Sequence, residues 1–142
     1  MPTRVIDVGP TTSELTSSTH VRLISTDGVQ DPYIALSYCW GADTTGVFTL
    51  HSETYSLMTG RGGICVSRLA RTHREVISLV RALGFRYLWI DALCIIQGDA
   101  ADWERESKTM ARVYGNAALT VIAGRSAGSK DGFVTNELLE RF

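Results

Sequence analysis

The chain has 142 residues, which is the size of one ordinary domain. Hydrophobic residues make up 44% of it and charged residues 20%, a balance that excludes a disordered chain and is typical of a globular protein. The formal net charge is −1, and acidic and basic residues are interspersed. Charge therefore gives no reason to expect nucleic acid or an anionic membrane as a partner.

Targeting and metal signals are also missing from the sequence. Residues 1–10 lack the apolar stretch of a secretory signal, and no apolar segment approaches the roughly 20 residues that cross a bilayer. Three cysteines, odd in number and far apart, do not suggest disulfides or a CxxC metal site, and the three histidines show no ligand spacing. We therefore expect a cytoplasmic protein with reduced thiols, no metal and no membrane partner.

The first predicted elements are two short strands at residues 4–8 and 21–25. Both contain β-branched residues, and a Gly-Pro step and a Ser/Thr-rich stretch separate them. We expect them to pair as an amino-terminal ribbon beside the main sheet.

A strand buried on both faces is predicted at residues 33–40, which are mostly apolar, follow a proline and stop at Gly41. Residues 41–63 form a long polar segment, with a short helical turn expected near residues 53–58. Loops of this length are unusual in a compact domain and often functional.

The first long helix is predicted to begin near Thr72. Thr72 and Glu75 have the spacing of a capping box, and an apolar stripe repeats at i, i+3, i+4 and i+7 from Val76. Gly84 is a suitable left-handed cap after the helix. Residues 87–90 then form the next strand.

A second helix is predicted from Asp102, as its N-cap, to about Tyr114. Residues 118–123 form a further strand, followed by a Gly/Ser-rich loop at residues 124–132. Alternating strands and helices imply a small, doubly wound, mostly parallel α/β sheet with helices on both faces. We expect a single domain over 1–142, with its core at about 33–133 and the start of a further segment at 134–142.

Ligands of such sheets bind beyond the carboxyl ends of the strands. Here those ends are residues 37–41, 91–97 and 123–126. The first two of these segments contain polar residues at the points where the apolar strands end. Ordinary turn chemistry explains these polar residues equally well.

The second helix has one carboxylate on its expected inner face. On a helical wheel Glu106 shares that face with five mostly apolar residues, Trp103, Ser107, Met110, Val113 and Tyr114. A buried carboxylate needs a donor, a raised pKa or water. Glu106 therefore either pins the helix through hydrogen bonds or lines a polar cleft that holds substrate, and the wheel alone favours the first interpretation.

Other candidates have simpler explanations. Cys94 lies in an apolar run, which indicates a small core residue. The tryptophans are expected in the core. Residues 124–128 could cradle a phosphate, but they lack the Lys-Ser/Thr ending of a P-loop.

Three segments together resemble the heterokaryon-incompatibility (HET) domain family of filamentous fungi: YIALSYCWG at residues 33–41, YLWIDALCIIQ at 87–97, and DWERE at 102–106 with the residues that follow it to 117. Their order and spacing match the family too. The family's Leu-Pro pair and Asp-Ala step around the first helix are replaced here by Leu69-Ala70 and Glu75-Val76.

The resemblance implies a role in fungal allorecognition, with programmed cell death as the response. HET domains are also similar to TIR domains, several of which cleave NAD with a glutamate on a helix, and Trp103 with Glu106 resembles that helix. This implies Glu106 as the catalytic residue and NAD as substrate, with no bound cofactor. The residues expected to bind substrate are Ser37, Trp40, Gly41, Asp91, Gln97 and Trp103.

Two other hypotheses stay open. The domain is a non-enzymatic signalling module that self-associates or recruits another incompatibility protein, for which an open sheet edge is suitable. Alternatively, it is an inactive, truncated remnant, given the altered helix entry.

Overall fold

The computed structural model describes residues 1–9, 19–41 and 44–123. In chain order these ranges form the elements β1 (Arg4–Asp7), β2 (His20–Ser25), β3 (Tyr33–Ser37), α1 (Ser52–Thr59), β4 (Ile64–Cys65), the 3-10 helix η1 (Val66–Arg68), α2 (Arg71–Ala82), β5 (Tyr87–Trp89), α3 (Asp91–Cys94), α4 (Ala100–Asn116) and β6 (Leu119–Ile122).

One six-stranded sheet has the order β4-β2-β1-β5-β3-β6. β3 is parallel to both β5 and β6, with Ile34 opposite Leu88 on one side and Leu119 on the other. The α/β class and the parallel core are therefore confirmed. The sheet as a whole is mixed, however, because the antiparallel β1–β2 pair joins it through β1 and β5.

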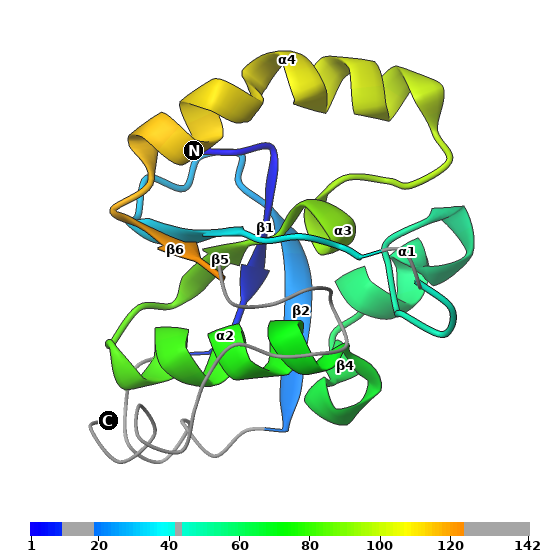
Figure 1. The fold of residues 1–142 in the computed structure, drawn as a ribbon, viewed down its shortest axis with the longest axis horizontal. Helices are drawn as coiled ribbons and strands as arrows, with labels where there is room; N and C mark the ends of the chain where they lie inside the picture. Colours follow the sequence, from blue (N-terminus) through cyan, green and yellow to red (C-terminus); the bar gives the residue numbers. More distant parts are fainter. Residues whose placement is uncertain (10–18, 42–43, 124–142) are drawn as a thin grey trace.

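Helices cover both faces of this sheet, as the sequence predicted. α4 lies across one face and α2 across the other (Figure 1). α2 ends where expected, because Gly84 follows it at φ +81°, in the left-handed region that favours glycine.

The predicted starts of the two long helices are wrong. α2 begins after Ala70, which has no side-chain cap, and Thr72 is fully buried instead of capping. The Glu75 carboxylate pairs with Arg71 on the helix surface. The N-cap of α4 is Asp99, three residues earlier than predicted, and its side chain accepts a hydrogen bond from the backbone N–H of Asp102 at 3.0 Å. Asp102 is thereby placed inside the helix.

The long polar segment contains more structure than the sequence predicted. α1 confirms the expected helical turn, but β4 and η1 were not expected, since a two-residue strand leaves no periodic signal. β4 pairs with β2 next to Gly63, whose φ is +62°.

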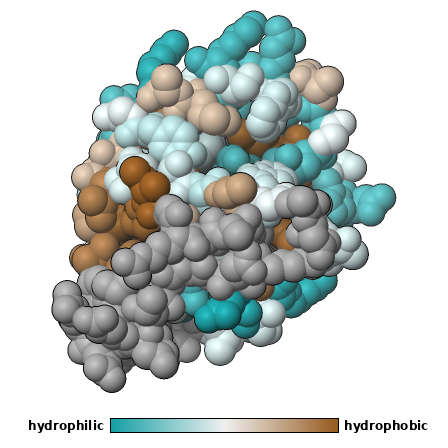
Figure 2. Space-filling view, in the orientation of Figure 1, coloured by the Kyte–Doolittle hydropathy of each residue, from teal (hydrophilic) through white to brown (hydrophobic). Residues whose placement is uncertain are grey.

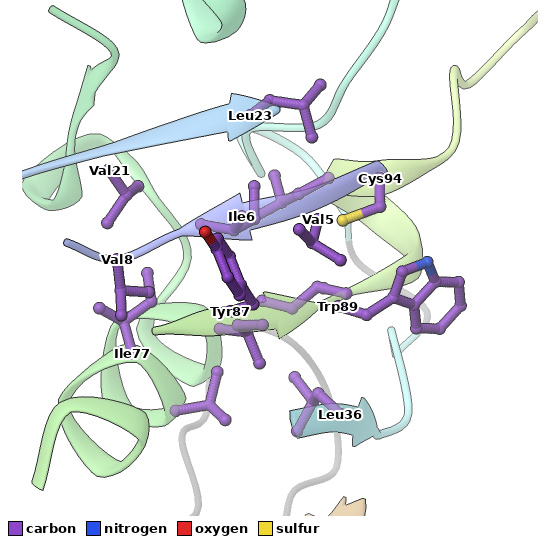
Figure 3. Close-up of a cluster of buried hydrophobic side chains, with 14 of the residues drawn as sticks. Val5, Ile6, Val8, Val21, Leu23, Leu36, Ile77, Tyr87, Trp89 and Cys94 are labelled. Atoms are coloured by element: carbon purple, nitrogen blue, oxygen red, sulfur yellow. The ribbon is translucent and has the colours of Figure 1, made fainter. Parts of the chain in front are cut away.

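The core lies on both sides of the central strands. Every residue of β1 is buried, including Arg4 and Asp7. Figure 3 shows the apolar side chains that pack around β1 and β5, among them Val5, Ile6, Val8, Leu36, Ile77, Trp89 and Cys94. The exposed side of α4 is mostly hydrophilic (Figure 2, top).

Within the described ranges no helix is long and apolar enough to cross a membrane. The predicted loop at residues 124–132 and the segment at 134–142 lie outside the described residues.

Candidate functional site

Trp40 and Asp91 meet where β3 and β5 end. The indole Nε1 of Trp40 donates to Asp91 Oδ2 at 3.0 Å, and the backbone N–H of Ala92 donates to Oδ1 at 2.8 Å. Burial raises the pKa of Asp91, and hydrogen bonds from Trp40, Ala92 and Tyr38 partly oppose that rise. Trp40 and Asp91, both predicted to bind substrate, are therefore hydrogen-bonded to each other at the expected edge of the sheet.

Tyr38 and His73 belong to the same cluster, although neither was predicted as a site residue from the sequence. Tyr38 stacks on Trp40 with ring centroids 6.4 Å apart, and its hydroxyl lies 2.8 Å from Nε2 of His73. His73 is fully buried, and burial lowers its pKa to about 4. Tyr38 and His73 are 35 positions apart in the sequence and meet only in the tertiary fold, so no local spacing could have indicated the pair.

Gln97 holds the segment after β5 in place. Its side-chain amide donates to the backbone carbonyls of Ile95 at 2.8 Å and Asp91 at 3.2 Å. Its own backbone N–H donates to Leu50, whose N–H in turn donates to Ala92. The Gln97 amide donors are thus engaged with backbone, and what remains for a ligand is the carbonyl oxygen of the side chain.

Asp102 is a second carboxylate of the site with three hydrogen-bond donors. Its Oδ2 accepts from Arg4 at 2.5 Å and from the backbone N–H of Ile96 at 2.8 Å, and its Oδ1 accepts from Arg105. Arg4 also donates to the Cys94 carbonyl at 2.9 Å. The side chain is only 2% exposed, so this network ties β1, α3 and α4 together in the interior.

Glu106, one turn later, is almost as deeply buried at 3% exposed but far less satisfied. Its recorded hydrogen bond within the described ranges is a long one of 3.4 Å from Arg105, a side chain that is itself 59% exposed. The inward orientation predicted for Glu106 is confirmed. The prediction that it is the sole inner carboxylate of the helix is wrong, because Asp102 is buried beside it.

Cys94 links the two carboxylate clusters in space. The charges of Arg4, Asp91 and Glu106 all act on its thiol, so the thiol lies within electrostatic range of each of them. The thiol is fully buried, and burial raises its pKa to about 12, which excludes a nucleophilic thiolate at neutral pH. Cys94 is the core residue that the sequence indicated.

Trp103 lies at the edge of the inner face of α4, and not within that face as the wheel predicted. It is 47% exposed, because Asp102, Glu106 and Val113 form the buried stripe. Trp103 and Gln97 instead line an open hollow of about 400 Å³ beside residues 98–100. The predicted face was defined by the mostly apolar residues of the helix, whereas the observed buried stripe contains Val113 together with the carboxylates of Asp102 and Glu106.

Ser37 and Gly41 lie beside the Trp40–Asp91 cluster in sequence. Ser37 ends β3 and its carbonyl accepts from Ala123 at 2.9 Å, while Gly41 has φ +82° directly after Trp40. In the part of the chain that the structure describes, no three His, Cys, Asp or Glu side chains are grouped as metal ligands.

These features define an α/β protein with a polar, aromatic cluster at the carboxyl ends of its parallel strands. The chain matches the family model "Heterokaryon incompatibility protein (HET)" over residues 33–141, and it therefore belongs to this family. No curated protein and no solved structure matches the chain. Family membership associates the chain with heterokaryon incompatibility.

Proposed function

We propose that the domain executes the incompatibility response by hydrolysing NAD, with Glu106 as the catalytic residue, and that NAD loss kills the cell. The observation that carries the proposal is the contrast between two neighbouring carboxylates. Asp102 already performs the structural task of pinning α4, with bonds from Arg4, Ile96 and Arg105. Glu106 is almost as deeply buried, but among the described residues its side chain has one long hydrogen bond, so packing alone does not explain it.

The chemistry of NAD fits carboxylates in this position. The glycosidic bond between ribose C1′ and the cationic nicotinamide nitrogen breaks, its electron pair stays on nicotinamide, and positive charge develops on the ribose. A carboxylate stabilises such an oxocarbenium-like state, as in glycoside hydrolysis. Water then adds to C1′ and releases a proton, which yields ADP-ribose and nicotinamide.

The aromatic pair beside Asp91 suits a flat heteroaromatic ring. Tyr38 and Trp40 are nearly parallel, with 14° between their ring planes, and Asp91 holds the Trp40 indole by a hydrogen bond. An aromatic face stacks on planar rings, and a carboxylate attracts a cationic one. Ser37, Gly41, Gln97 and Trp103 complete the proposed substrate contacts.

The direct experiment measures nicotinamide release from NAD by the purified domain at high protein concentration. We expect turnover by the wild type and a loss of about 100-fold or more in Glu106→Gln, the size seen when one transition-state contact is removed. Glu104→Gln is the matched control, since Glu104 lies two residues earlier on α4 with a 70% exposed side chain paired to Lys108. Equal rates in wild type and Glu106→Gln would exclude the catalytic role.

A non-enzymatic assembly module is the second candidate, favoured by the sheet edge. β6 pairs with β3 on one side and with no described strand on the other, and Leu119 and Ile122 are 44% and 74% exposed. Such edges can pair with a second copy or another incompatibility protein. If Ile122→Lys abolishes self-association, measured by light scattering, and killing persists, this candidate fails.

A further inference from the structure

His73 is a buried histidine with an unusual hydrogen-bond pattern. It lies in the first turn of α2, is fully buried, and contacts the Tyr38 ring edge-on with centroids 5.2 Å apart. Its Nε2 is 2.8 Å from the Tyr38 hydroxyl oxygen. Its Nδ1 is also buried, and in the described part of the chain this atom has no hydrogen-bond partner.

The position of the His73 proton follows from this pattern. Burial lowers the pKa of His73 to about 4, so at neutral pH the ring is neutral and carries one N–H. A proton on Nδ1 would leave a buried donor unpaired, whereas a proton on Nε2 lies in the bond to Tyr38 and leaves only an acceptor unpaired. Buried donors without partners are the rarer case, so the proton belongs on Nε2.

The Tyr38 hydroxyl is then directed toward Asp91. Its oxygen accepts from His73, which leaves its single hydrogen to donate to the Asp91 carboxylate, a bond that opposes the burial-induced rise in the Asp91 pKa. Asp91 thus receives hydrogen bonds from Tyr38, from the Trp40 indole and from the Ala92 backbone.

We propose that His73 is a positioning residue of the site, which acts through the Tyr38 hydroxyl to hold the Asp91 carboxylate against Trp40. An unpaired buried nitrogen costs stability, and such costs are concentrated at functional sites. The role of this unit toward substrate rests on the proposed function. The hydrogen-bond chain itself does not.

The Trp40 indole N–H reports the protonation state of Asp91 by NMR, because the indole is hydrogen-bonded to the Asp91 carboxylate. Its proton–nitrogen resonance, assigned with Trp40→Phe, is followed against pH. The midpoint of this titration reports the pKa of Asp91. Tyr38→Phe removes the hydroxyl donor and is expected to raise the midpoint by about one pH unit, since a hydrogen bond to the ionised carboxylate favours the ionised form. His73→Phe is expected to raise it by less, because the Tyr38 hydroxyl remains but is no longer directed.

Two controls keep the measurement specific. His73→Gln retains an N–H donor near the place of Nε2 and is expected to restore the wild-type midpoint. Cys94 and Tyr114 both interact electrostatically with Asp91, and Arg4 and Glu106 act on the Cys94 thiol. The titration is therefore repeated in Glu106→Gln, and the His73 variants remove the imidazole, so that the midpoint can be assigned to Asp91. An unchanged midpoint in both His73→Phe and Tyr38→Phe overturns the proposal.

The tautomer and the enzyme assay complete the test. Nitrogen NMR of the His73 ring is expected to show protonated Nε2, and protonated Nδ1 would overturn the proposal. If the wild type releases no nicotinamide while the midpoint shifts are found, the positioning chain is supported and the proposed function fails. If the wild type cleaves NAD and His73→Phe changes neither the midpoint nor the rate, the proposed function stands and the positioning role fails.

Discussion

Asp102 and Glu106 are two buried carboxylates on one helix that differ in their hydrogen bonding. They are about 40° apart on the helical wheel, so both point inward. Their placement could have been predicted from this spacing, but the arginine that satisfies Asp102 could not, because Arg4 lies 98 residues away. Long-range pairing of this kind leaves no trace in local sequence.

Replacing Asp102 with alanine is expected to destabilise the fold by about 3–5 kcal/mol, because Arg4 would be left buried without its partner. Urea denaturation measures the change. Arg105→Ala is the control, since Arg105 is 59% exposed and should cost less than about 1 kcal/mol. Equal effects of the two substitutions would contradict the structural role of Asp102.

His73 is expected to make stability depend on pH. Its pKa falls from 6.5 to about 4 on folding, so the unfolded chain binds more protons between these values. The contribution of neutral His73 to the free energy of unfolding, about 3 kcal/mol, is fully present above pH 6.5 and is lost as the pH falls toward 4. Denaturation of the wild type and His73→Phe at pH 7 and 4.5 tests this, with a flatter profile expected for the variant. Identical slopes would refute it.

Most of the elements could be predicted because each has a local cause. The buried apolar run of β3, the amphipathic stripe of α2 and the glycine after it are confirmed. The helix starts were wrong because several polar residues near each start could serve as the cap, and tertiary burial of Thr72 and Asp102 decided between them. β4 was not predicted, because it is a strand through its pairing with β2 and not through its composition.

Gly63 is where that pairing constrains the sequence most. A Cβ at this position would lie 2.1 Å from the Val21 carbonyl oxygen, and the φ of +62° already disfavours other residues. Gly63→Ala is therefore expected to cost more than about 2 kcal/mol in thermal or urea unfolding. Gly62→Ala, which would meet no atom within 4 Å, should change stability by less than about 0.5 kcal/mol. Comparable losses would argue against the β2–β4 contact.

At the scale of the whole molecule, the amino-terminal ribbon is an integral part of the fold. The family match begins at residue 33, yet β1 pairs with β5 and Arg4 binds Asp102. The sequence predicted the two strands and their pairing but not their central place in the sheet, since strand order depends on contacts distant in the chain.

Removal of residues 1–26 is accordingly expected to abolish cooperative folding. The deletion takes away β1 and β2, leaves β4 without a partner and exposes one side of β5. Near-ultraviolet circular dichroism and thermal unfolding would report the loss of fixed packing. A truncated chain that melts with the wild-type midpoint would show that residues 27–142 fold without the ribbon.

The central claim is that Glu106 drives NAD loss at the carboxyl ends of the parallel strands. Its most direct test expresses the wild type and Glu106→Gln at matched levels in a fungal host and follows NAD content and viability together. We predict that NAD falls before viability in cells with the wild type and that both are preserved with Glu106→Gln. Cell death with unchanged NAD, or equal killing by the two proteins, would contradict it.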